Sequence, residues 1–406
     1  MKLREGQKEA QEAAVAVIKS HRRIGFYIGL MLATLFSSWS QAAVLPEDRT
    51  DVMYHRYEGG GLVIDGPSVL VRKQFKDTIS VWGNYYTDSI SGASIDLLTQ
   101  GSTYYEEERT EKSVGFEYLH DRTIFSLSAT NSSERDYEAN SVAFGVSQEF
   151  FGDMTTLSLS FAQGDDEVRE NIYEDGNIIR TEDRGDVTRK RFGLGLTQVL
   201  TPKLMLAFNA ESVVDEGFLN NPYRRVRYID GSDFSTQPEV YPNTRNSDAF
   251  ALRAMYYMWY RAAIRAEYRV FSDSWGISAS NYELRYIHPW KERWIFEAKF
   301  RAYDQTSADF FSDLFPFEDA QNFLARDKEL SEYTNTSFGL GVSYEIDQDF
   351  FRFLDSTTVN LFWDYTKFDY ENFREVTDQT RPAGVGNEPF YSFDANIVRL
   401  FFSVTY

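Results

Sequence analysis

The chain has 406 residues, no cysteine and a formal charge of −20 at pH 7. The lack of cysteine excludes disulfides, thiolate metal sites and a cysteine nucleophile, and the negative charge argues against nucleic acid as a partner, because phosphate binding needs a basic surface. Aromatic residues make up 16% of the chain. This share is high for a soluble protein, although composition alone also allows a secreted β-protein.

Residues 1–42 are predicted to be a secretory signal peptide. The stretch "SHRRIGFYIGLMLATLFSSWSQAA" has a basic start, an apolar run from Ile24 to Phe36, and small residues up to Ala42. Such a pattern is typical of a cleaved signal, and we expect cleavage between Ala42 and Ala43. The apolar run is shorter than the roughly 18 residues of a spanning helix, which argues against the alternative of a membrane anchor.

Residues 67–406 are predicted to be β-strands throughout. In "RWIFEAKFRAY", Trp294, Phe296 and Phe300 alternate with the charged Glu297 and Lys299. Successive strand residues point to opposite faces, so this segment has one apolar and one charged face. In "SFGLGVSYEI", "RFGLGLTQ" and "VAFGVSQEF" the second face is small instead of charged. A helix would need apolar residues three and four apart, whereas these segments keep a period of two.

The connections between these strands alternate in length. Short ones fall at 75–78, 119–122, 149–154, 200–203, 259–261, 288–291 and 347–356. Between them lie mostly long polar ones near 88–108, 164–186, 214–246, 305–333 and 371–390, with shorter exceptions near 131–136 and 271–275. Outer-membrane barrels follow this rule, with tight periplasmic turns and longer extracellular loops. We therefore predict an all-β fold, a single transmembrane antiparallel β-barrel in the outer membrane.

The strand count depends on residues 43–66. Fifteen strands lie between Ser68 and Tyr406, and an even number requires one more. The stretch "DVMYHRYEGGG" can supply it, with the glycine run 59–61 as a turn, which gives about sixteen strands. The competing interpretation makes residues 44–66 a periplasmic or luminal segment on a fourteen-stranded barrel.

The chain ends on "IVRLFFSVTY", which we interpret as the strand that closes the barrel. Its apolar face consists of Val398, Leu400, Phe402 and Val404, and Tyr406 is the terminal aromatic. A strand at this place closes against the first strand and ends at an aromatic in the membrane interface. We expect it also to serve as the signal that the barrel-assembly machinery recognises.

A group of charged residues on consecutive strands is predicted to face the lumen. Its members are Arg253, Arg265, Glu267, Arg269, Glu283, Arg285, Glu297, Lys299 and Arg301. One interpretation is a pore wall that sets ion or solute preference. The other is a ladder of cross-strand ion pairs that stiffens or seals the interior, and the interleaving of both signs favours it slightly.

Two of the predicted loops have unusual charge patterns. Residues 164–186 gather Asp165, Asp166, Glu167, Glu174, Asp175, Glu182 and Asp183. Carboxylates can hold Ca²⁺, but this spacing matches no calcium-loop motif, so we expect a solvated loop and no metal. In loop 214–246, "NNPYRRVRY" places Arg224, Arg225 and Arg227 among aromatics. The default is a plain surface loop, and the alternatives are folding into the lumen or contact with lipopolysaccharide phosphates.

The sequence gives little support for catalysis. Outside the signal, the histidines are His55, His120 and His288, which are far apart in sequence. A hydrolase needs a nucleophile, a base within reach and a partner that orients the base, and no such set can be assembled. We therefore expect no enzymatic activity, no cofactor and no metal.

Several long stretches resemble a family of proteobacterial outer-membrane barrels. They are "LPEDRTDVMYHRYEGGGLVIDGPSVLVRKQF", "VWGNYYTDSISGASIDLLT", "RDYEANSVAFGVSQEFFGDMTTLSLSF" and "FLNNPYRRVRY". The family is the domain of unknown function thirty-five seventy, and the resemblance runs from Leu45 to the C-terminus. It implies an outer-membrane barrel without established activity, so no site residues are carried over from it. It also suggests a redox-linked periplasmic setting.

We therefore expect a channel or transport-related barrel for small solutes or ions. The alternative is a plugged structural or assembly barrel, which would dock a periplasmic partner at the turns "EFFGDM" and "DQDFFRFLDS". The remaining expected partners are outer-membrane lipids, lipopolysaccharide and the barrel-assembly machinery.

Overall fold

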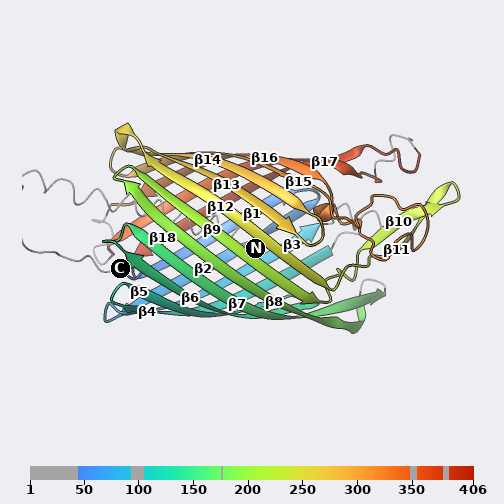
Figure 1. The fold of residues 1–406 in the computed structure, drawn as a ribbon, viewed down its shortest axis with the longest axis horizontal. Coiled ribbons are helices and arrows are strands. Elements are labelled where there is room, and N and C mark those ends of the chain that lie inside the picture. Colours follow the sequence, from blue (N-terminus) through green and yellow to red (C-terminus); the bar gives the residue numbers. More distant parts are fainter. Residues whose placement is uncertain (1–43, 93–104, 175–176, 348–353, 378–383) are drawn as a thin grey trace, which may run out of the picture.

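The computed structural model describes residues 44–92, 105–174, 177–347, 354–377 and 384–406. Sixteen of the strands form one closed antiparallel barrel (Figure 1). They are β1 (Arg49–Gly59), β2 (Leu62–Phe75), β3 (Ile79–Gly92), β4 (Tyr105–His120), β5 (Thr123–Ser133), β6 (Tyr137–Phe150), β7 (Thr155–Glu174), β8 (Asn177–Thr201), β9 (Leu204–Gly217), β12 (Thr244–Tyr257), β13 (Ala263–Asp273), β14 (Ser278–Trp290), β15 (Trp294–Gln305), β16 (Tyr333–Glu345), β17 (Ser356–Arg374) and β18 (Phe390–Thr405).

Four smaller elements of the described chain lie outside the barrel wall. The strands β10 (Arg225–Asp230) and β11 (Asp233–Pro238) form a separate two-stranded sheet. Two short 3₁₀ helices, η1 (Trp259–Arg261) and η2 (Lys328–Leu330), complete the elements. In the part of the chain that the structure describes, no helix is both long and apolar enough to cross a membrane.

The period of two seen in the sequence decides which side chains face outward. On β15, Phe296 and Phe300 are 42% and 48% exposed, whereas Ile295 and Glu297, on either side of Phe296, are buried. In a closed barrel every strand has two hydrogen-bonded neighbours, so no unpaired backbone edge faces the hydrocarbon. The exposed apolar face is therefore the one that faces lipid, and the polar or small face lines the lumen.

Strand β1 closes the barrel. It pairs with β18 from Arg49↔Thr405 to Gly59↔Ala395, and with β2 along its other edge. The count of sixteen is therefore confirmed and the fourteen-stranded alternative is wrong. The turn into β2 needs glycine, because Gly60 and Gly61 have φ angles of 61° and 81°. Two successive residues with positive φ make the tight hairpin turn that suits the twist of the strands.

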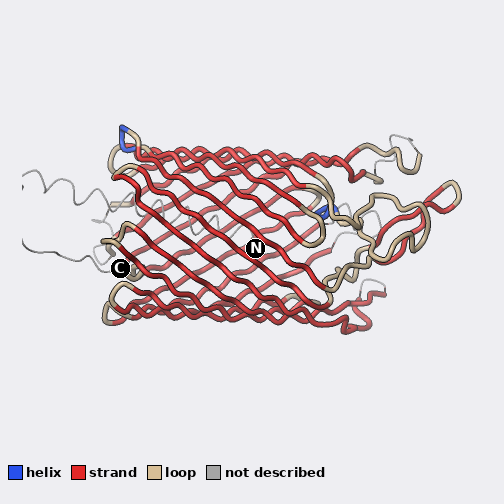
Figure 2. Tube along the Cα trace, in the orientation of Figure 1, coloured by secondary structure: helices blue, strands red, loops and turns tan. Residues whose placement is uncertain are grey.

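The connections alternate between the two ends of the barrel (Figure 2). At the turn end, where β1 begins and β18 ends, the connections are 76–78, 121–122, 151–154, 202–203, 258–262, 291–293 and 346–355. At the loop end lie 60–61, 134–136, 218–243, 274–277, 306–332 and 375–389, and the connections from β3 to β4 and from β7 to β8 lie outside the described residues. The predicted alternation is confirmed. The turn 346–355 between β16 and β17 and the loop 375–389 lie partly outside the described residues.

The prediction of a solvated loop at 164–186 was wrong, because this stretch is a hairpin. Strands β7 and β8 continue as far as Glu174 and from Asn177. Its polar residues alternate with Val168 and Val187, which are 6% and 3% exposed and lie on the inner face. Cross-strand ion pairs, such as Arg184–Glu170, join the outer charges. The high number of charges obscured the alternation of buried and exposed residues, which is compatible with strands that extend beyond the membrane.

Candidate functional site: a charged lumen under a loop cap

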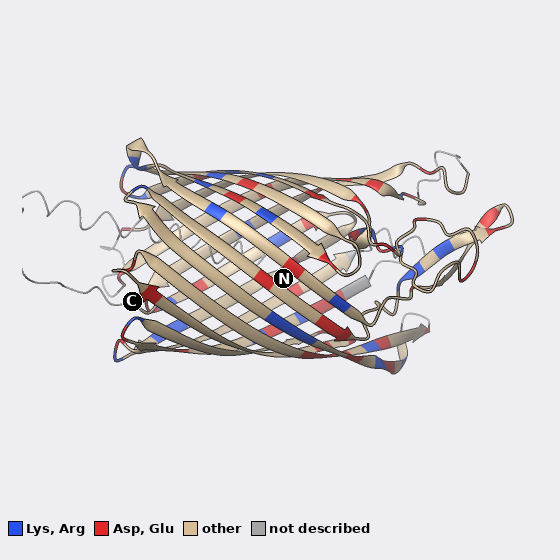
Figure 3. Ribbon diagram, in the orientation of Figure 1, with Lys and Arg blue, Asp and Glu red and all other residues tan. Residues whose placement is uncertain are grey.

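The lumen contains a cavity of about 620 Å³. Residues of eleven strands line it, namely β1, β7 to β9 and β12 to β18. Eight of the nine predicted lumen residues are among them: Arg253, Arg265, Glu267, Arg269, Glu283, Arg285, Lys299 and Arg301. The ninth, Glu297, is 7% exposed and lies within the wall beside Arg285. The barrel strands at the top of Figure 3 carry interleaved acidic and basic residues.

Ion pairs connect the charged wall from strand to strand. The Arg253 Nε donates to Glu267 Oε2 at 2.8 Å, and the same carboxylate accepts from Arg265 at 3.3 Å. Arg285 in turn reaches Glu283 at 3.1 Å and Glu297 at 3.4 Å. These contacts form a ladder across β12 to β15. The wall is thus both a set of ion pairs and the lining of the cavity.

The ladder continues through Asp364, a residue that sequence reasoning missed. Lys299 Nζ lies 2.6 Å from Asp364 Oδ1, and Arg399 donates to the other oxygen. The pair reaches across Gly339, where an added Cβ would lie 2.1 Å from Asp364 Oδ1. Only the alternation of β17 and β18 could have marked Asp364 and Arg399 as inward-facing. Their pairing with Lys299 could not be seen without the strand order.

Two further arginines use other partners. Arg301 donates from its Nε to the Asn281 side chain, and Arg269 lies 3.8 Å from Glu211. Asn281 comes from the neighbouring strand β14, whereas Glu211 comes from β9, with β12 between it and β13. The result is a wall of bulky side chains held in fixed positions.

The part of the cavity wall on β7 and β8 is made of small residues. Ser158 and Ser160 of β7 and Gly193 and Gly195 of β8 line it. The packing between the two strands is close, because a Cβ added at Gly193 would lie 2.3 Å from Ser160 Oγ. Since these side chains extend little from the backbone, the open space lies on the side of β7 and β8.

Three connections at the loop end fold together into what we call the loop cap, residues 218–243, 306–332 and 384–389. Its apolar core includes Tyr241, Phe310, Ala325 and Leu330, and Trp275 of the neighbouring 274–277 connection packs into it. The Tyr241 and Trp275 rings meet edge to face, with centroids 5.4 Å apart. A second cluster joins Val226, Phe315 and Leu324. The cap is therefore a packed structure and not a set of separate surface loops.

Arg227 is the central ion-pairing residue of the loop cap. It is 1% exposed, and it donates to the Asp313 carbonyl at 2.9 Å, to the Asp313 carboxylate and to Glu388 Oε1 at 2.6 Å. Arg326 donates to the same Asp313 carboxylate at 3.1 Å. All three connections of the cap thus meet at one buried network. The default of a plain surface loop for 214–246 was wrong, because Arg227 is buried in the cap.

The loop cap links nearly opposite arcs of the barrel rim. On one side, Tyr223 accepts from the backbone N–H of Asn171 on β7 at 2.8 Å and donates to Asp136 between β5 and β6. Burial raises the pKa of Tyr223, so its hydroxyl remains a donor. On the other side, Arg224 pairs with Asp327 of the connection between β15 and β16. In the closed strand order these arcs lie across the barrel, so the cap spans the mouth, as the loops at the right of Figure 2 show.

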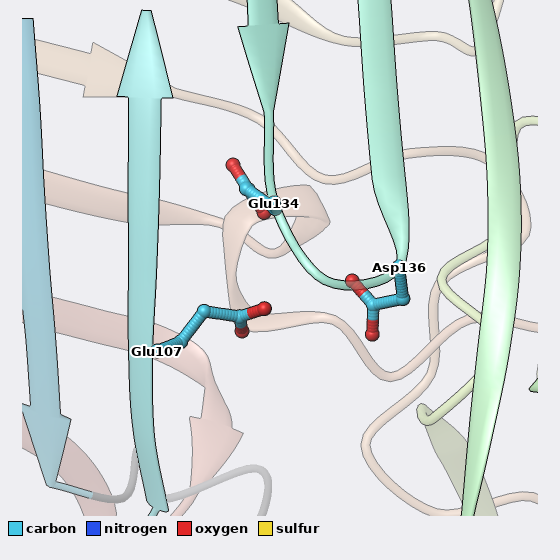
Figure 4. Close-up of side chains that lie close together, drawn as sticks. All are labelled: Glu107, Glu134 and Asp136. Carbon is cyan, nitrogen blue, oxygen red and sulfur yellow. The ribbon is translucent and has the colours of Figure 1, made fainter.

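Three carboxylates meet beside the anchor of Tyr223 (Figure 4). One oxygen each of Glu107, Glu134 and Asp136 lies within 4.8 Å of the others. Burial and the neighbouring carboxylates Asp136 and Asp88 raise the pKa of Glu134, although Arg109 opposes them. Ca²⁺ takes about six to eight oxygen ligands, twice what this group supplies. We assign no metal to it and regard it as an acidic feature of the mouth.

The three histidines lie apart, as their sequence positions suggested. His55 Nε2 lies 2.8 Å from Asp88 Oδ1 and 3.2 Å from the Tyr86 hydroxyl. His120 lies beside Asp121 at 3.8 Å, and His288 Nδ1 lies 2.9 Å from the Tyr286 hydroxyl. The described contacts of these imidazoles are thus with carboxylates and phenols, and they give no serine or threonine nucleophile a base.

The residues predicted for the closing strand all lie on the outer face or at its end. Val398, Leu400 and Phe402 are 39%, 46% and 39% exposed. The Tyr406 backbone N–H donates to the Asp48 carbonyl at 3.2 Å, and Lys73 Nζ lies 5.0 Å from its ring centroid. The predicted cleavage site at Ala42 and Ala43 lies outside the described residues.

We expect the loop cap to loosen in acid. Burial raises the pKa of Glu388, but the hydrogen bonds from Arg227 and from the Gly386 backbone outweigh it, so this pKa lies below its usual value. A carboxyl with a lowered folded pKa stabilises the fold above its unfolded pKa of about 4.3, and this contribution is lost as the pH falls through the folded value.

Hydrogen exchange across residues 306–332, corrected for intrinsic rates, should show this loosening between neutral pH and about pH 3, below the usual range of the carboxyl. The barrel strands serve as the internal reference. Glu388→Gln should remove the pH-dependent step. Identical protection of the cap at both pH values in the unaltered chain would contradict the assignment.

The comparison with solved structures finds proteins of low sequence identity. A bacterial polysaccharide outer membrane secretin covers 89% of this chain and 100% of its own, with a TM-score of 0.49 and 6% identity. The siderophore receptor PirA from Pseudomonas aeruginosa has a TM-score of 0.42 and 10% identity over 81% of this chain, which spans 60% of that receptor. OmpT of Vibrio cholerae has a TM-score of 0.40 and 9% identity over 89% of this chain and 100% of its own.

The sequence comparisons complete the picture. A search of the curated proteins finds no match. The family described as "Protein of unknown function (DUF3570)" matches residues 98–353, which is more than half of the chain. The resemblance of the sequence motifs pointed to the same family. With its closed antiparallel barrel and this match, the chain belongs to the DUF3570 family.

Proposed function

We propose that the protein is an outer-membrane channel for small polar solutes or ions, whose mouth is restricted by the loop cap. The observation that carries this proposal is the lumen cavity of about 620 Å³, lined by residues of eleven strands. A sixteen-stranded barrel is wide enough to leave an aqueous channel unless loops or side chains fill it. Here the bulky side chains come from β12 to β15, and the small residues on β7 and β8 leave the cavity beside them open.

The ion-pair ladder is compatible with transport. Each pair holds its side chains against β12 to β18, as Arg253–Glu267 at 2.6 Å does, so the charges line a path and do not cross it. A rigid charged lining is how many pores discriminate between solutes. The two interpretations of the charged residues are therefore compatible, because the same ion pairs can stiffen the wall and set its preference.

The test is single-channel conductance of the chain refolded from Ala43 into a planar bilayer. We expect discrete, reproducible steps of small size, because the cap restricts the mouth. Heat-dependent gel mobility of the same sample shows that it is folded. Silence from folded protein, with no conductance after the cap is opened by mutation, would overturn the proposal.

A second candidate is a closed barrel that docks a periplasmic protein at its turns. The turn 151–154 favours it, because Phe151 and Met154 are 75% and 50% exposed at the turn end. The other proposed docking turn lies largely in residues 348–353, outside the described part of the chain. Co-purification of a stoichiometric partner that Phe151→Ser abolishes would support this candidate over the channel.

We propose no enzymatic role and no cofactor for this barrel. We further propose that lipids, lipopolysaccharide and the assembly machinery are its remaining partners, since any outer-membrane barrel is inserted into such a membrane.

A further inference from the structure

We propose that the lumen contains a binding site for small oxyanions, phosphate or carboxylate, at Arg265, Arg285 and Lys299, and that this site makes the channel anion-selective. The selectivity rests on the proposed function. The binding site itself does not, since a closed barrel could also hold it.

The first observation is a row of three cations on adjacent strands. Arg265 of β13 lies directly opposite Arg285 of β14, and Arg285 lies directly opposite Lys299 of β15. Like charges at opposite positions of neighbouring strands are destabilising. All three side chains line the cavity. An arrangement with this cost is more common at functional sites than in structural walls.

The second observation is that the carboxylates around the cavity do not balance its cations. Among its lining residues, seven are basic, namely Arg253, Arg265, Arg269, Arg285, Lys299, Arg301 and Arg399. Four are acidic, namely Glu211, Glu267, Glu283 and Asp364. The lining thus has a formal excess of three positive charges. Glu297 reduces this excess only from within the wall, where it pairs with Arg285 at 3.4 Å.

The third observation is that buried donors in this wall lack acceptors. Arg285 is 7% exposed, and its Nε has no hydrogen-bond partner among the described residues, nor has the Nε of Arg399. A buried donor without an acceptor costs free energy. An oxyanion at the cavity face offsets this cost by adding negative charge beside the guanidinium groups, whose planar forks match carboxylate and phosphate oxygens.

The adjoining part of the cavity wall, on β7 to β9, gives such an anion room and neutral donors. Ser158, Ser160 and Asn209 line the same cavity and can donate from hydroxyl and amide groups. The whole chain carries a formal charge of −20, and the carboxylates Glu107, Glu134 and Asp136 lie at the loop end. Net charge alone would therefore predict cation preference, so the sign of the selectivity tests the lumen site specifically.

The experiment measures phosphate binding and ion selectivity on the same refolded chain. Inorganic phosphate should raise the thermal unfolding temperature, and the reversal potential in a KCl gradient should show preference for chloride. In the double variant Arg285→Gln/Lys299→Gln we expect phosphate binding to be weakened about tenfold or more, with loss of the chloride preference. The control is Lys76→Gln/Lys203→Gln, which removes the same charge from two exposed turns.

A second variant covers the case in which removing wall cations prevents folding. Asn209→Asp adds a carboxylate of nearly the same shape to the cavity lining on β9 and replaces no member of the ion-pair ladder, so it should weaken phosphate binding and reduce chloride preference. A conducting chain without chloride preference would overturn the selectivity and leave the proposed function standing. A folded chain whose unfolding temperature is unaffected by phosphate would overturn the binding site, whether or not it conducts.

Discussion

A chain that begins at Leu62 instead of Ala43 is expected not to form a barrel. This truncation removes β1 and its turn, and both neighbours of β1 lose a partner along eleven residue positions. The exposed edges cannot simply join each other. Strands β18 and β2 are both antiparallel to β1 and therefore run in the same direction, whereas the sheet is antiparallel throughout. Unpaired backbone groups in hydrocarbon cost several kcal/mol each, on the order of the stability of a whole domain when summed.

The measurement is refolding in detergent followed by heat-dependent gel mobility and circular dichroism. The chain from Ala43 is the matched control and should give a compact, heat-modifiable species. If the shortened chain gave the same species with the same strand content, closure would not depend on β1.

Arg227→Met is expected to unfold the loop cap while the barrel remains intact. The substitution keeps an apolar stem of similar length but leaves Glu388 without its arginine partner and Asp313, which is 9% exposed, with Arg326 alone. Removing one partner of a buried ion pair costs roughly 3–5 kcal/mol. This loss of free energy is concentrated in the cap, because the described ion pairs of Arg227 are with the connections 306–332 and 384–389 and not with a barrel strand.

Two measurements follow from this expectation. Trypsin should cleave after Arg326, which is 4% exposed in the intact cap, and single-channel conductance should rise because the mouth is no longer covered. Arg225→Met on the same hairpin is the control, since Arg225 is exposed and bonds only to Thr236 in the described contacts. Equal protease resistance in the two variants would show that the network at Arg227 does not hold the cap together.

The barrel could be predicted from the sequence because its wall obeys a local rule. Each strand has to present an apolar face to lipid, so segments such as "RWIFEAKFRAY" show their period without reference to any other segment. The same rule placed Arg265, Glu283 and Lys299 on the inner face. The parity of the connections is also local, because it follows from counting along the chain.

The cap and the partners inside the lumen could not be predicted in this way. Arg227 and Glu388 are 161 positions apart in sequence, and nothing local in "NNPYRRVRY" shows that one of its three arginines is buried. Asp364 and Lys299 meet only because β16 between them offers Gly339. The hairpin of β7 and β8 was missed for a different reason, because high charge density was taken as evidence for a loop.

The side chains that line the lumen differ in size from strand to strand, so the cavity has a preferred position within the barrel as well as a charge. With arginine and lysine on β13 to β15 and serine and glycine on β7 and β8, the free cross-section is displaced from the barrel axis toward the thin side. Identical bulky adducts should therefore act very differently at the two sides. A reagent attached at Ser158 would narrow the open side of this cavity, whereas the same reagent on β14 would occupy space that side chains already fill.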